Sequence, residues 1–234
     1  MWKARAMMPR TPDGARRRFA TAAMAGVAIY VLVDVALHFL PPYYSVISDA
    51  ESNLAVGPFG WIMNLNFLGR ALTTLCAIAA INRVGPDTGP RRTGAVLMAA
   101  GGLCSAILAF FPTDVADAGI LAATTVGIVH LYVAGLGFMA ALTGMLVLTR
   151  WIRSSPELAK AHPAAFTLAA IAAAGLASLG LAAAIGPDLL GLAERVCLAG
   201  VLGWVLVVCA AIRRLPRRPW PDPLLPRHSR ERIL

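Results

Sequence analysis

Six long stretches of apolar residues alternate with short polar connections along the chain. They run roughly over residues 19–40, 60–81, 94–111, 120–148, 164–185 and 189–212. A helix needs roughly 20 mostly apolar residues to cross the hydrocarbon core of a bilayer, and these stretches are close to that length. They are rich in Ala and Leu and do not alternate apolar with polar positions, which disfavours strands. The pattern predicts an all-α fold, a bundle of six transmembrane helices.

Composition supports a membrane protein. Hydrophobic residues make up 58% of the 234 residues and charged residues 14%, whereas a soluble domain carries about 25% charged residues. The net charge of +9 lies in short runs beside the apolar stretches. It forms no basic face with interleaved aromatic residues, so nucleic acid is not an expected partner. The four cysteines lie inside apolar stretches without a CxxC pair, and we expect them to be small buried residues.

Basic residues mark one side of the predicted membrane domain. Lys and Arg occupy the N-terminal arm, the second and fourth connections and the C-terminal tail. The other three connections have neither, and carry Asp49, Glu51, Asp114, Asp117 and Asp188. Because Lys and Arg are retained on the cytoplasmic side, both termini are predicted to be cytoplasmic. The predicted organisation is a basic arm over residues 1–18, a six-helix membrane domain over 19–212 and a disordered basic tail over 213–234.

The fifth apolar stretch repeats small residues at four-residue spacing, as in Ala169, Ala173 and Ala177. Small faces allow helix backbones to approach closely in lipid. We expect this helix to lie inside the bundle and to serve packing.

Ionisable and amide side chains lie in the halves of the apolar stretches next to the acidic connections. Such residues cost at least about 2.5–3.5 kcal/mol each at mid-membrane, so they need a partner or a function. The predicted ligand-binding residues are Asp34, His38, Asn66, Arg70, His130 and Arg195. Together with Asp114, they are expected to line one pocket open to the outer surface, in which Asp34 pairs with Arg70. The structural alternatives are an ion pair that fixes helix packing, a satisfied buried imidazole at His130, and interfacial side chains at Glu194 and Arg195.

Four sequence motifs resemble the bacterial membrane family called domain of unknown function (DUF) 998. They are the "SNLAVGPFGW" stretch with a following Asn-Phe at Asn66, "FPTD" ending at Asp114, "GIVH" ending at His130, and "GLAER" ending at Arg195. The motifs occur in the family's order and cover roughly residues 20–212. The resemblance implies a six-helix integral membrane protein, here of the bacterial plasma membrane, and implies no particular activity.

Three functions are compatible with these residues. The favoured one is binding or sensing of an anionic small molecule or lipid headgroup by Asn66, Arg70, His130 and Arg195, without catalysis and without a cofactor. The second is a metal-dependent intramembrane hydrolase, in which His38, Asp114 and His130 would hold zinc. The third is a small proton-coupled transporter using Asp34 and His38. A transport pathway would need polar groups in the cytoplasmic half of the bundle, where the sequence has few.

Overall fold

The computed structural model describes residues 12–41, 43–115 and 123–216, and the regular secondary structure over these residues is all helical. The helices are α1 (Pro12–Leu37), α2 (Gly60–Ile81), α3 (Gly89–Leu108), α4 (Thr125–Ser154), α5 (His162–Ile185) and α6 (Leu190–Arg214). Three short 3-10 helices, η1 (Glu51–Ala55), η2 (Ala159–Ala161) and η3 (Pro187–Leu189), lie in the connections. The predicted six-helix fold is therefore confirmed.

The boundaries match the hydrophobic pattern best for α2 and least well where helices continue past the apolar region. α1 begins at Pro12, so several residues of the predicted basic arm are helical. α4 continues to Ser154, past the predicted end at 148. The rest of the arm, most of the tail and Asp117 lie outside the described residues.

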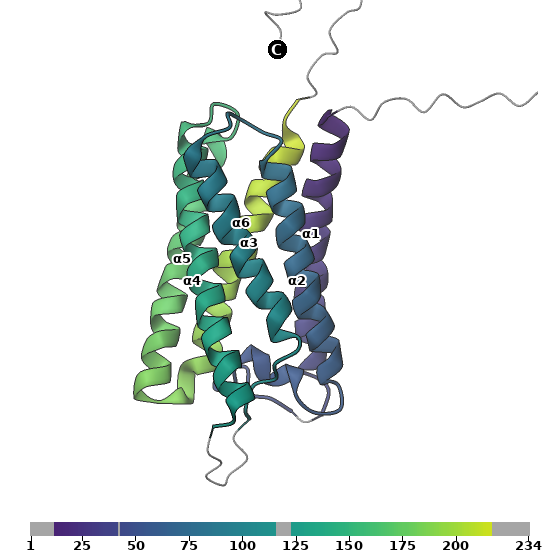
Figure 1. The fold of residues 1–234 in the computed structure, drawn as a ribbon, viewed down its shortest axis with the longest axis vertical. Helices are drawn as coiled ribbons and strands as arrows, with labels where there is room; N and C mark the ends of the chain where they lie inside the picture. Colours follow the sequence, from purple (N-terminus) through teal and green to yellow (C-terminus); the bar gives the residue numbers. More distant parts are fainter. Residues whose placement is uncertain (1–11, 42, 116–122, 217–234) are drawn as a thin grey trace, which may run out of the picture.

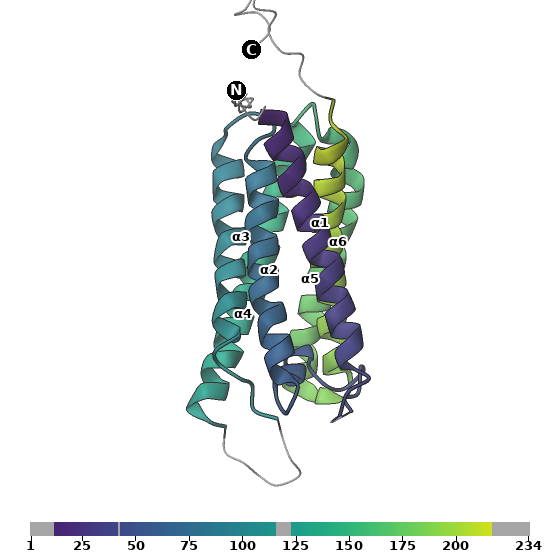
Figure 2. The same cartoon turned by 90° about the vertical axis from the view of Figure 1, so that its right-hand side faces the viewer.

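The six helices form an antiparallel bundle (Figure 1, Figure 2). Each helix contacts the next along the chain, and α6 also contacts α1. α6 also contacts α2 and α4, which makes it the central helix. Its buried residues include Trp204, Val208 and Ile212, and the Trp204 indole N–H donates to the Thr149 hydroxyl at 2.8 Å. This bond gives both buried polar groups a partner inside the bundle.

The prediction that the fifth stretch lies inside the bundle is wrong. In the most apolar window of α5 only 17% of the residues are buried, against 50% in α6. α5 uses a row of small residues to approach α6 closely, and a Cβ at Gly175 would meet the backbone of Cys197. The remaining faces of α5 are open, because it has close neighbours only in α4 and α6 among the long helices. A uniformly apolar helix can face lipid instead of protein, and the sequence pattern does not distinguish the two.

Five of the six helices, all except α3, are long and apolar enough to cross a membrane. α3 carries Arg91 and Arg92 in its first turn and contains several glycines, which lower its hydropathy. It lies alongside α4 through backbone-close contacts, since a Cβ at Gly101 would meet the carbonyl oxygen of Gly137. With five such spans, the chain has the make-up of a multi-pass membrane protein.

The two ends of the bundle carry opposite charge patterns. The basic end holds the described N- and C-termini, the α2–α3 connection and the α4–α5 connection, where Arg83, Arg92, Arg153 and Lys160 are exposed. The acidic end holds the α1–α2, α3–α4 and α5–α6 connections (bottom of Figure 1). The charge asymmetry of the sequence therefore corresponds to the two opposite ends of the folded bundle.

Candidate functional site

A folded connection covers the acidic end of the bundle between α1 and α2. Its backbone bonds to the start of α6, where the Leu192 N–H donates to the Ile47 carbonyl at 2.9 Å. Gly191 makes this approach possible, because a Cβ there would collide with the Asp49 carbonyl oxygen. The connection then enters η1, whose first residue, Glu51, is buried. Contact with α6 thus brings a charged connection residue into the helix bundle.

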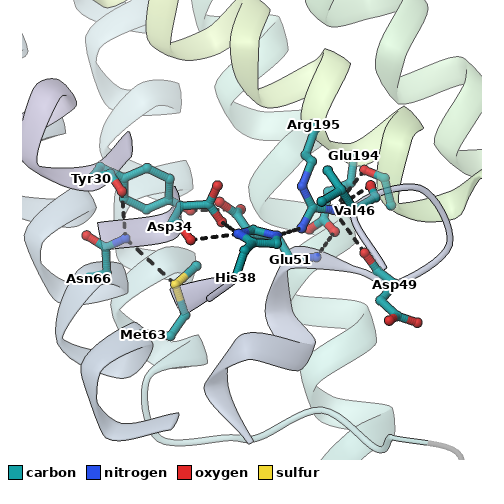
Figure 3. Close-up of polar contacts among 11 residues, drawn as sticks. Tyr30, Asp34, His38, Val46, Asp49, Glu51, Met63, Asn66, Glu194 and Arg195 are labelled. Carbon is teal, nitrogen blue, oxygen red and sulfur yellow. Dashed lines mark hydrogen bonds and ion pairs between the residues drawn. The ribbon is translucent and has the colours of Figure 1, made fainter. Parts of the chain in front are cut away.

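Arg195 fastens this connection to α6. Its Nη1 donates to the carbonyl oxygens of Val46 (3.2 Å), Asp49 (2.9 Å) and Gly191 (3.2 Å). Its Nη2 lies 2.6 Å from Nε2 of His38. The other ring nitrogen, Nδ1, lies 2.7 Å from the Asp34 carbonyl oxygen. Because a carbonyl only accepts, Nδ1 carries the proton and Nε2 accepts from Arg195. Both terminal nitrogens of Arg195 are therefore occupied by the protein (Figure 3).

Glu51 and Glu194 form a buried acidic pair beside Arg195 and the connection that it fastens. The Tyr30 hydroxyl donates to Oε2 of Glu51 at 2.8 Å, and the Glu51 N–H donates to Oε2 of Glu194 at 2.7 Å. Both acidic residues are at least nine-tenths buried. Burial raises the pKa of Glu51 well above its ordinary value, and the neighbouring Glu194 and Asp34 carboxylates raise it further. The connection therefore holds a carboxyl group with a strong tendency to keep its proton.

Asp34 and Asn66 complete this group of polar side chains. The Asn66 amide donates to the Tyr30 carbonyl at 3.1 Å and lies 3.7 Å from the Met63 sulfur. Asp34 has one buried carboxylate oxygen, Oδ1, without a hydrogen-bond partner, 3.9 Å from Nδ1 of His38. The group comprises Tyr30, Asp34, His38, Glu51, Asn66, Glu194 and Arg195, and we call it the acidic-end cluster (Figure 3).

Arg70 lies between the acidic-end cluster and the middle of the bundle. Its Nε donates to the Ser105 hydroxyl at 2.9 Å, and Ser105 in turn donates to the Phe67 carbonyl at 2.9 Å. The guanidinium lies 5.6 Å from the centre of the Tyr30 ring and 5.7 Å from that of Phe67. Within the described chain, Nη1 and Nη2 of Arg70 make no hydrogen bond. Its positive charge partly offsets the rise in the pKa of Glu51.

A cavity of about 50 Å³ adjoins Arg70 in the bundle interior. Its lining comes from α2, α3, α4 and α6 and includes Ser105, Thr73 and Thr74 on the polar side. The remaining walls are mainly apolar, with Leu108, Phe138 and Leu202 among them. Since one water needs roughly 10–15 Å³ by this kind of measure, the cavity has room for a few waters or a small ion.

The predicted ion pair between Asp34 and Arg70 is absent from the described structure. Arg70 bonds to Ser105 on α3, and Asp34 faces His38, which directly follows the end of α1. The positive charge of Arg70 acts instead on Glu51 of the α1–α2 connection, whose pKa it lowers in part. The predicted pairing considered only the two neighbouring helices and took no account of a connection that folds into the bundle.

His130 and Asp114 form a separate local arrangement at the start of α4. Nδ1 of His130 lies 2.6 Å from the Phe111 carbonyl. Asp114 accepts from the Thr124 N–H at 2.8 Å and from the Thr124 hydroxyl at 2.7 Å. A Cβ at Gly127 would overlap the Asp114 carboxylate, so the glycine of this motif leaves room for the acid. These contacts fasten the end of α3 to α4 and do not connect either residue to the acidic-end cluster.

The zinc set considered for a hydrolase is not assembled. The described residues contain no group of three or more His, Cys, Asp or Glu side chains arranged to hold a metal. His38 faces Asp34 and Arg195, while His130 faces Phe111. A metal site built from His38, Asp114 and His130 therefore has no geometric basis in this part of the chain.

Sequence reasoning did not select Tyr30, Glu51 or Ser105 and treated Glu194 as interfacial. Tyr30, Asp34 and His38 are each four residues apart, a spacing that places them on one helical face and could have identified Tyr30. Glu51 and Ser105 carried no such signal. Glu51 reads as a solvated loop acid, and Ser105 as one of many small residues in α3.

The chain matches one family model over residues 24–211, described as "Protein of unknown function (DUF998)". The chain belongs to the DUF998 family. The match includes part or all of each of the six long helices and every residue of the acidic-end cluster, so this cluster lies within the DUF998 region. No curated protein and no solved structure matches the chain.

Proposed function

We propose that this DUF998 protein binds a small anion, or the anionic group of a larger molecule, at Arg70. The supporting observation is that the part-buried Arg70 is held by a hydrogen bond from its Nε, while Nη1 and Nη2 remain without acceptors in the described chain. Arginine presents these two nitrogens in a fork that fits carboxylate and phosphate oxygens. The low dielectric of a membrane interior strengthens such contacts.

The proposed ligand set is narrower than the one expected from sequence. Arg195 already donates to three carbonyl oxygens and to His38, so it serves the connection and is not the main ligand contact. Asn66 likewise donates to a helix carbonyl. The cavity of about 50 Å³ beside Arg70 favours a small anion or a carboxylate over a whole lipid headgroup. The function requires neither a cofactor nor a catalytic step.

The proposed setting is the bacterial plasma membrane, with the acidic end outside and both termini in the cytoplasm. Basic residues are retained on the cytoplasmic side of membrane proteins, which supports this orientation. The ligand would then approach from the outer surface, through the end covered by the α1–α2 connection.

The test is anion-dependent stabilisation of purified protein. We expect acetate or inorganic phosphate to raise the melting temperature of the wild type, because a ligand that binds only the folded state stabilises it by mass action. Arg70→Gln should abolish this rise, and Arg153→Gln, at an exposed arginine of the basic end, should keep it. Glycerol phosphate, a soluble headgroup analogue, separates a small-anion site from a lipid site. No anion effect in the wild type, or an equal effect in Arg70→Gln, would overturn the proposal.

A second candidate is a proton-coupled transporter. The acidic-end cluster contains three carboxyl groups, Asp34, Glu51 and Glu194, near two cations, Arg70 and Arg195. One more acid than cation favours retention of a proton in the cluster. Beyond Thr73 and Thr74, however, the interior toward the basic end is mainly apolar, with Met145, Leu148 and Trp204 fully buried, and the buried Thr149 hydroxyl there already accepts from Trp204. If the wild type supports proton uptake into vesicles and Glu51→Gln does not, the result would favour a transporter over a binding protein.

A further inference from the structure

A second recess lies at the opposite, basic end of the bundle. α1 and α5 make no close contact there, and α6 lies between them (Figure 1). A groove of about 1170 Å³ lies there, lined by the first turns of α1, the last turns of α6 and the α4–α5 connection. This exceeds the roughly 300–1,000 Å³ of typical small-molecule sites, so the groove suits an extended molecule.

The floor of the groove is apolar and follows the membrane-spanning part of α6. It consists of Leu206, Val207, Ala210 and Ala211, which are all partly exposed. Their spacing places them on one helical face. From Leu206 to Arg214 the helix rises about 12 Å, so the floor extends from the basic end into the apolar span. Such a surface fits the upper part of an acyl chain.

The mouth of the groove is cationic. Lys160 and Arg214 line it from the connection and from α6, and both are exposed. Arg16 lines it from α1, where it is 4% exposed and donates to the carbonyl oxygens of Leu215 and Pro216, both at 3.2 Å. One acid, Glu157, also lines the groove, and it accepts from the Gly85 N–H at 2.9 Å. Three cations and one acid therefore surround the opening.

We infer that this groove is a binding site for a phospholipid with an anionic headgroup, its phosphate at Lys160 and Arg214 and one acyl chain along α6. An apolar channel beside a cationic mouth at the end of the membrane span matches that amphiphile in both charge and polarity. The chain's own residues 217–234 are a poorer occupant, because they carry five arginines and two acids and repeat the charge of the mouth. The inference is independent of Arg70 and of the function proposed for the acidic end.

The experiment uses the full chain, purified and titrated with phosphatidylglycerol or with phosphatidylcholine of the same acyl chains. Intact-complex mass spectrometry counts the retained lipids. We expect the wild type to retain phosphatidylglycerol in preference to phosphatidylcholine. Lys160→Ala with Arg214→Ala should weaken phosphatidylglycerol binding roughly 25-fold, since each basic side chain near the surface contributes about five-fold.

Two further variants distinguish specific binding in the groove from nonspecific attraction of anionic lipid by surface charge. Arg150→Ala with Arg153→Ala removes the same charge from exposed positions on α4 that do not line the groove, and should retain the preference. Ala210→Trp fills the apolar floor without changing charge, and should reduce retention of both lipids. The inference is overturned if the wild type shows no preference, if the α4 variant loses as much binding as the groove variant, if Ala210→Trp binds normally, or if a second copy of the chain replaces lipid in the complex.

Discussion

Arg195 and Glu51 together hold the α1–α2 connection on the acidic end. Arg195 binds the connection through its backbone carbonyls, and Glu51 enters the bundle as a buried acid between Tyr30 and Glu194. A cation that satisfies several carbonyls tolerates burial, whereas an acid beside other acids does so most readily in its neutral form. The two side chains are thus expected to respond differently to substitution and to pH.

Removal of the Arg195 side chain should release the connection. Arg195→Ala leaves the carbonyls of Val46 and Asp49 without their donor. Because bonds to charged groups contribute about 1.5–3 kcal/mol each, we expect a loss of roughly 2–4 kcal/mol in the free energy of unfolding. Hydrogen exchange should accelerate over residues 45–51. Arg153→Ala is the matched control, and equal exchange in both variants would contradict the role assigned to Arg195.

Glu51 should make stability depend on pH. Its folded-state pKa lies well above the ordinary value of 4.5, so the folded chain keeps a proton that the unfolded chain has lost. The free energy of unfolding should therefore fall as pH rises from about 4.5 toward the raised pKa. Glu51→Gln cannot titrate, and its amide oxygen still accepts from Tyr30, so its melting temperature should vary less over this range. Asp188→Asn, an exposed acid of the same end, should retain the wild-type slope. An unchanged slope in Glu51→Gln would exclude Glu51 as its source.

At the scale of the helices and connections, the α1–α2 connection lies very close to the first turn of α6. The approach depends on Gly191, whose missing side chain leaves room for the Asp49 carbonyl. The same principle brings α5 against α6 and α3 against α4, where glycine and alanine replace larger side chains. Small residues therefore determine how closely the helices approach one another, while large apolar residues fill the space that remains between them.

Two glycine substitutions test this point at the element scale. Gly191→Ala should lower the melting temperature, because the added methyl displaces the connection. Gly180→Ala places a methyl where nothing lies within 4 Å, and an alanine in a helix interior gains up to about 1 kcal/mol over glycine. It should leave the melting temperature unchanged or raise it. A loss of stability in Gly180→Ala similar to that in Gly191→Ala would refute the spacing argument.

The helices were predictable from the sequence, whereas much of the polar site was not. The long apolar stretches predict all six helices and give the exact boundaries of α2. They do so because helix formation in lipid depends on local composition. The acidic-end cluster depends on where the α1–α2 connection folds back, which no local pattern encodes. Glu51 lies only nine residues before α2, yet it reaches the interior through contacts with α6, far along the chain.

At the scale of the whole molecule, opposite charge at the two ends predicts its orientation. Reporter fusions after Gly89 and after Asp188 should read cytoplasmic and external, respectively, because the first site lies among basic residues and the second does not. The measurement is paired reporter activity, with one reporter active on each side of the membrane. A cytoplasmic signal from the Asp188 fusion would reverse the proposed orientation.

The modest hydropathy of α3 bears on how the chain is inserted during synthesis. α3 falls short of the other helices in apolar character, yet its backbone at Gly94 and Gly101 lies close to Gly144 and Gly137 of α4. A segment with weak affinity for lipid gains a stable position once a neighbour covers its exposed backbone. We therefore expect a ribosome-bound chain that ends after α3 to leave this helix accessible to water-soluble thiol reagents at Cys104, and a chain extended through α4 to protect it. Biogenesis of this protein would then proceed by helical hairpins, with α4 recruiting α3 into the bilayer.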